Sequence, residues 1–126
     1  MFILVVTAAM ALAQTSAKTQ PSPQAPAPAP SARLVSYDEA VRCAGLTQAA
    51  SELEGGESRY GRSLYDAALY WSLAAMQAAT VAGRNPAVAE TEQTRARLDA
   101  VRRLSAGESE ARATLQRCRQ KAPRLG

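Results

Sequence analysis

Two cysteines, Cys43 and Cys118, are the residues of this chain with the most distinctive chemistry. A pair of thiols can form a disulfide, exchange electrons as a redox couple, or stay free inside a core. Redox couples usually lie close together, as in Cys-x-x-Cys, whereas these two are far apart in the sequence. We therefore predict a structural disulfide between them, with free buried thiols and a redox couple as the alternatives.

Side chains suited to catalysis or metal binding are scarce elsewhere. The chain has no His, which excludes His-based acid/base catalysis, His-containing triads and His metal ligands. Two Cys are too few for a four-thiolate zinc site, and no glycine-rich phosphate loop is present. Its close acidic pairs are two residues apart, so their carboxylates would point to different sides of a helix: Glu52/Glu54, Glu90/Glu92 and Glu108/Glu110. We expect no enzyme activity, no cofactor and no metal.

The first 33 of the 126 residues differ in composition from the rest. Residues 1–13 form an uncharged apolar run that ends in Ala11-Leu12-Ala13, a pattern typical of a cleaved secretory signal peptide. The run has no Lys or Arg at its start, so an uncleaved N-terminal anchor is the alternative. Residues 14–33 hold five of the seven prolines and predict a disordered Pro/Ala-rich linker.

Residues 34–122 show helical periodicity and no strand-like alternation, which predicts one all-α domain. A capping box that begins at Ser36 and is completed by Glu39 starts the first helix, and Gly55 ends it. Asn85 is a good N-cap for the third helix, since a proline follows it. We predict four helices with short connections, over about 37–54, 58–82, 86–105 and 108–121, and a disordered tail at 123–126.

Short connections between helices favour antiparallel neighbours, so the expected architecture is a small up-down four-helix bundle. In such a bundle the first helix begins at the end where the fourth finishes. This arrangement brings Cys43 and Cys118 to the same end, where a disulfide can staple the domain. The staple matters because 28 of the 126 residues are Ala, which bury little area each.

The helix at 58–82 has two apolar stripes, which predict contacts with neighbouring helices on both of its sides. One stripe includes Leu64 and Trp71, and the second comprises Tyr65, Leu69, Leu73 and Met76. The stretch 67–83 is uncharged, but it is short and rich in Ala, which favours a central bundle helix over a membrane span. For the third helix the expected buried stripe is Thr91, Thr94, Leu98 and Val101.

Charge is distributed unevenly along the folded region. Residues 34–94 carry four basic and eight acidic side chains, a net charge of −4, whereas residues 95–126 carry nine basic and three acidic, a net charge of +6. Either the two halves pair across the bundle, or the basic side chains form a contact surface for an acidic protein, anionic lipid or wall polymer. On the third helix this candidate surface, called here the basic strip, comprises Arg95, Arg102 and Arg103.

Tyr70 is a second candidate for a contact, because it lies off both apolar stripes and is expected to be exposed. Nucleic acid is not an expected partner. The predicted export argues against it, and no aromatic side chain lies among the basic residues to stack on bases.

Together these features predict a small exported, non-enzymatic protein of the bacterial envelope, either periplasmic or secreted. Its expected role is that of a protein-binding accessory module, such as an inhibitor, chaperone or immunity-type factor for another envelope protein. The alternative is a structural envelope protein, anchored in the inner membrane by an uncleaved N-terminus, that contacts anionic lipid or wall polymer through its basic helices.

Overall fold

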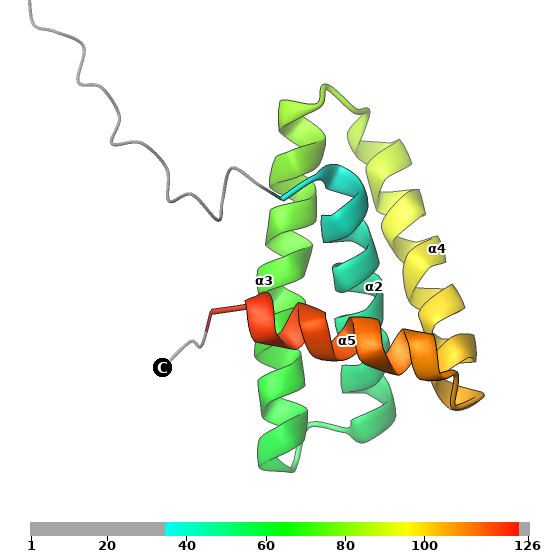
Figure 1. Ribbon diagram of the computed structural model, residues 1–126. Coiled ribbons are helices and arrows are strands. Elements are labelled where there is room, and N and C mark those ends of the chain that lie inside the picture. The colour runs from blue at the N-terminus through cyan, green and yellow to red at the C-terminus, as the bar shows by residue number, and fades with distance from the viewer. Residues whose placement is uncertain (1–34, 124–126) are drawn as a thin grey trace, which may run out of the picture. The chain divides into compact units, whose positions relative to one another are not determined.

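The structure is a computed structural model that describes residues 35–123. The predicted signal peptide (1–13), the linker (14–33) and the last three residues of the predicted tail lie outside that range. No strand occurs within residues 35–123, and every helix bound lies within one residue of its predicted position, which confirms the all-α fold. The four helices are α2 (Tyr37–Glu54), α3 (Arg59–Val81), α4 (Pro86–Ser105) and α5 (Ser109–Lys121), labelled as in Figure 1.

Short polar side chains and glycines set the ends of these helices. The Ser36 hydroxyl accepts a hydrogen bond from the Glu39 amide at 3.1 Å, which is one half of the predicted capping box. The Glu39 carboxylate accepts instead from Lys121 Nζ at 2.6 Å, so it ties the start of α2 to the end of α5. Three glycines with positive φ follow the ends of α2, α3 and α4: Gly55 (83°), Gly83 (69°) and Gly107 (72°).

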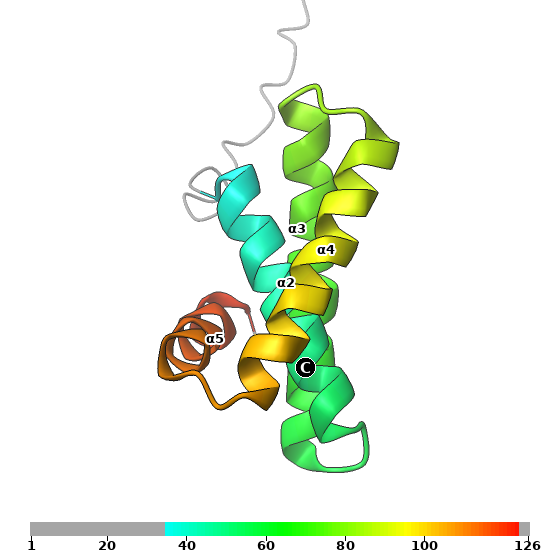
Figure 2. The same ribbon diagram turned by 90° about the vertical axis from the view of Figure 1, so that its right-hand side faces the viewer.

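Three helices run alongside one another, and α5 lies across them. Figure 1 shows α5 crossing α2 and α3, and Figure 2 shows it nearly end-on while the other helices run upright. The predicted four-helix bundle is confirmed, but its fourth helix crosses its neighbours instead of running antiparallel beside them. The reason is that the narrow buried stripe of this 13-residue helix has to meet both α2 and α3, which it does by bridging them.

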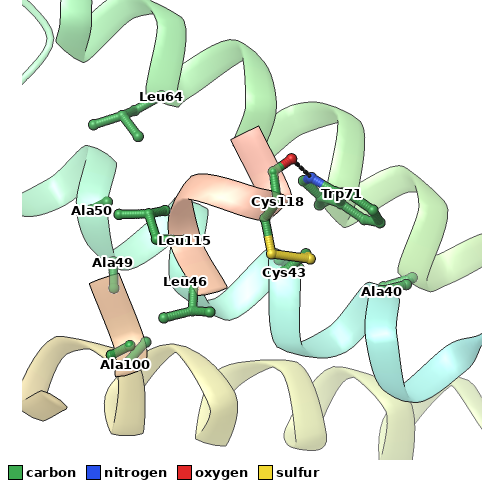
Figure 3. Close-up of a cluster of buried hydrophobic side chains, with 13 residues drawn as sticks. Ala40, Cys43, Leu46, Ala49, Ala50, Leu64, Trp71, Ala100, Leu115 and Cys118 are labelled. Carbon is green, nitrogen blue, oxygen red and sulfur yellow. Dashed lines mark hydrogen bonds between the residues drawn. A yellow bond between two sulfur atoms is a disulfide. The ribbon is translucent and has the colours of Figure 1, made fainter. Parts of the chain in front are cut away.

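One main core lies where the helices meet around a single large aromatic side chain. Trp71, which is 1% exposed, forms one cluster with Leu64, Leu46 and Leu115 beside the disulfide (Figure 3). Most other members are alanines, which let helices approach closely but remove little apolar surface from water. They come from all four helices: Ala40, Ala44, Ala49, Ala50, Ala75, Ala100 and Ala111.

The buried face of α4 also consists of small residues, and the stripe predicted for this helix is largely wrong. Ala89 and Ala100 are buried, whereas Leu98 is 53% exposed. Of the predicted stripe only Val101 packs, partly buried, against the core. Small side chains are buried here because they allow α4 to approach α2 closely. Gly45 of α2 lies directly against the backbone of α4.

Replacing Gly45 with Ala should destabilise the fold. The added Cβ would lie 2.8 Å from the backbone C and O of Ala96, so α2 and α4 would have to separate. We expect a loss of about 1–3 kcal/mol in the free energy of unfolding, the usual cost of overpacking, despite the better helix propensity of Ala. Urea unfolding followed by circular dichroism measures it.

Gly56→Ala is the matched control, because no atom lies within 4 Å of the Cβ it would add. Its unfolding midpoint should stay close to that of the unmodified protein. Equal midpoints for the Gly45 and Gly56 variants would show that α2 and α4 are not in close contact.

Candidate functional site

The predicted disulfide is confirmed and joins α2 to α5. Cys43 and Cys118 have their Cα atoms 5.4 Å apart and are 3% and 1% exposed. Trp71 Nε1 donates a buried hydrogen bond to the Cys118 carbonyl at 2.9 Å, so α3 is tied to the same point (Figure 3). A disulfide this deeply buried is inaccessible to a second thiol, which supports a structural role over a redox role.

The most conspicuous surface feature is the second apolar stripe of α3, called here the α3 stripe. Its members are exposed by 57% (Tyr65), 44% (Leu69), 70% (Leu73) and 44% (Met76). The prediction that α3 has helices on both sides is therefore wrong within residues 35–123. Its other face is buried in the core. This face stays largely exposed because α4 packs chiefly on α2 and reaches the stripe at Met76, whose Sδ accepts a hydrogen bond from Gln93 Nε2 at 3.3 Å.

The basic strip does not behave as one surface. Arg102 forms an ion pair with Asp99 one turn away, and Arg103 pairs with Glu108 at 2.9 Å. The hydrogen bonds that Arg103 donates to Glu108 also raise the pKa of Arg103. Arg95 is exposed and makes no ion pair with any described residue.

Pairing between the acidic and basic halves is partial. Two ion pairs join the halves, Arg97 to Glu52 at 3.1 Å and Lys121 to Glu39 at 2.6 Å. The other three within residues 35–123 are local to one half. Exposed ion pairs of this kind contribute little stability, so they organise the surface more than they hold the fold.

Tyr70 is partly buried, unlike the exposed position expected for it. Its ring packs edge-on against Trp71, with the centroids 5.1 Å apart, and it borders the core. Tyr65 on the α3 stripe is the more exposed aromatic residue, at 57%. The sequence pattern placed Tyr70 off both apolar stripes, but it did not show that the Tyr70 ring packs against the ring of Trp71, its neighbour in the chain.

A polar cluster near the start of α2 joins this helix to α4. The Tyr37 hydroxyl donates to Glu92 Oε1 at 3.0 Å, and the Arg84 guanidinium lies 4.2 Å from the centre of the Tyr37 ring. Burial, and then the hydrogen bond to Glu92, raises the pKa of Tyr37. The phenol therefore stays protonated and acts as a donor that joins α2 to α4.

Sequence reasoning missed a groove between the start of α3 and the end of α5. Its volume is about 1140 Å³, and Arg59, Arg62 and Arg119 line it. The Arg119 guanidinium lies over the Tyr60 ring, 4.6 Å from its centre. One clue was present in the sequence, since the first turn of α3 carries two arginines and no acidic residue.

No family model matches this chain. No curated protein and no solved structure matches it either. Across residues 35–123, no three His, Cys, Asp or Glu side chains are grouped in a way that could hold a metal ion. None of the four described helices is both long and apolar enough to span a membrane.

Proposed function

We propose that this chain is a small exported, non-enzymatic module of the bacterial envelope that acts by binding another envelope protein. The observation that carries the proposal is the α3 stripe. A domain whose core is mostly alanine leaves four larger side chains of one helix facing water. Contiguous exposed apolar surface of this kind is typical of interaction sites.

The pattern of the α3 stripe favours a partner with an apolar groove that receives α3. Tyr65, Leu69, Leu73 and Met76 follow one another at steps of four, four and three residues, the spacing of helix-in-groove anchors. The stretch 67–83 carries no charge, so Arg62 is the one basic residue of α3 within a turn of the stripe, fewer than contact with anionic lipid would use.

The size of the stripe argues for a concave partner. It covers 12 residues of α3, so it is only about 17 Å long. A flat partner on so short a strip would bury far less than the roughly 800 Å² per side of a standard interface. A groove would also cover the flanks of the helix and bury more surface.

Export is supported by two independent features. The predicted signal peptide at 1–13 provides the route, and a buried disulfide that closes a long loop fits an oxidising compartment such as the periplasm or the cell exterior. Protein-binding accessory modules of this kind include inhibitors, chaperones and immunity-type factors. The identity of the partner decides which of these roles the protein has.

The proposal predicts that polar residues on the α3 stripe abolish association without unfolding the protein. A double variant with Leu69→Gln and Leu73→Gln, called here the stripe variant, should reduce the amount of partner that co-purifies from the native envelope at least about tenfold, because the buried apolar anchors are lost. Both residues are at least 44% exposed, so the melting temperature should change little.

The matched control replaces Arg95, Arg102 and Arg103 with Gln, which alters the basic strip and leaves α3 intact. This control should retain the partner. If it loses the partner while the stripe variant keeps it, the basic strip is the contact and our assignment is wrong. A purified protein that is dimeric through the stripe would also contradict the proposal, since a second copy would then cover α3.

A further inference from the structure

The groove between α3 and α5, called here the α3–α5 groove, concentrates positive charge that the fold does not neutralise. Arg59 and Arg62 lie on its α3 side and Arg119 on its α5 side, and Asp66 is the only carboxylate among the described residues that line it. The five ion pairs within residues 35–123 involve none of these four side chains. Three arginines without an ion pair among the described residues therefore line one groove.

Arg119 is held in place without an ion pair to any residue of the described range. Its guanidinium stacks on the Tyr60 ring at 4.6 Å, which fixes its position by a cation–π interaction. Its Nε is buried and has no hydrogen-bond acceptor among the described residues. Because Nε is closed to solvent, a phosphate in the groove would be held by the two amino groups of the same guanidinium, Nη1 and Nη2.

The two arginines of α3 lie where the helix dipole disfavours positive charge. They lie in the first turn, where the positive end of the helix dipole disfavours cations. The Arg62 side chain donates to the Glu57 carbonyl at 2.8 Å, and it forms no ion pair with a carboxylate within residues 35–123. α2 and α5, in contrast, each begin with acidic residues. The arrangement stabilises a bound anion more than it stabilises the helix.

We propose that the α3–α5 groove binds a phosphate group, free or carried by another molecule. A carboxylate has two oxygens, which one guanidinium can hold through two hydrogen bonds. Three arginines that line one groove from two helices match an anion with more oxygens and more charge, and phosphate supplies both. Ser63, Gln116 and Gln120 also line the groove and provide neutral donors.

Only the α5 side of this site is separate from the α3 stripe. Arg62 in the groove precedes Leu69 in the stripe by seven residues, so at about 100° per residue they point to the same side of α3. Arg119 belongs to α5, so Arg119→Gln is the variant that separates loss of phosphate binding from loss of partner binding.

The test is a titration of the oxidised, exported protein with inorganic phosphate, followed by ¹H–¹⁵N NMR at constant ionic strength. Saturable shifts should appear at residues 59–63 and 116–120. Arg119→Gln, and separately Arg59→Gln with Arg62→Gln, should weaken binding about tenfold or more, because each removes charged hydrogen-bond donors.

A variant with Arg95→Gln and Arg112→Gln is the matched control, since it removes the same charge outside the groove. It should bind phosphate as the unmodified protein does. Equal weakening in groove and control variants, or no saturable shift, would overturn the site.

Vesicles of phosphatidylglycerol distinguish the source of the phosphate. Sedimentation of the protein with these vesicles, lost in the groove variants and kept in the control, would support a lipid headgroup. Binding of inorganic phosphate without vesicle sedimentation would support a soluble phosphorylated compound.

Discussion

Removing the disulfide should lower the free energy of unfolding by about 4–5 kcal/mol, as estimated from the entropy of closing a loop of this length. The two cysteines are 75 positions apart, so their bond restricts most of the folded region in the unfolded state. Replacing both Cys43 and Cys118 with Ala avoids leaving an unpaired thiol. Urea unfolding of the oxidised protein and the double variant measures the difference.

This loss should be a large share of the total free energy of unfolding, because small domains are only marginally stable. Reduction of the disulfide in the unmodified protein should also lower its urea unfolding midpoint. Mass spectrometry of the unreduced exported protein should show the two-hydrogen deficit of a disulfide. Two alkylatable thiols, or an unchanged midpoint for the double variant, would contradict the bond's role.

The second largest effect is expected from Trp71→Ala, a loss of about 3–5 kcal/mol. Trp71 is the largest fully buried side chain, and the alanines around it cannot collapse into the space it would leave. Because it is the only Trp in the chain, unfolding of the variant has to be followed by circular dichroism.

Trp71→Phe separates packing from hydrogen bonding. It keeps an aromatic ring but loses the bond from Nε1 to the Cys118 carbonyl. That carbonyl still accepts from the Ala122 amide at 3.2 Å, so the expected loss is near 1 kcal/mol, at the lower end for a buried acceptor. If the Phe and Ala variants were equally unstable, the hydrogen bond and not the packing would be the main contribution of Trp71.

The sequence was sufficient for the elements whose signals are local. Ser36 and Gly55 identify the ends of α2 because a cap depends on a few neighbouring residues. The disulfide was predictable because two cysteines allow only one pairing within the chain. The four helices were predictable from such capping and helix-ending residues and from the absence of strand-like alternation.

Packing was less predictable, because it depends on which residues meet. Alanines occur throughout the chain, so the sequence of α4 did not distinguish its buried alanines from exposed ones. The larger Leu98 was therefore wrongly expected to be buried. Sequence alone also could not decide that the side of α3 carrying Leu73 would have no neighbour. That outcome depends on α4 approaching α2 through Gly45.

The crossing of α5 explains why the α3–α5 groove was missed. Arg119 follows Arg62 by 57 positions, and no local pattern links them. They line one groove only because α5 lies across α3, where Trp71 and the disulfide hold it. The sequence predicted that the fourth helix runs antiparallel beside its neighbours. That arrangement gave no reason to expect a groove where α5 crosses α3.

The most direct test of the account is photo-crosslinking from position 73 in the native envelope. A photoreactive amino acid in place of Leu73, at the centre of the α3 stripe, should form one adduct with a different envelope protein. The same residue in place of Leu98, which is 53% exposed on α4 beside the basic strip, should form none. An adduct from position 98 but not from 73, or one that contains two copies of this chain, would contradict the assignment of α3 as the partner-binding surface.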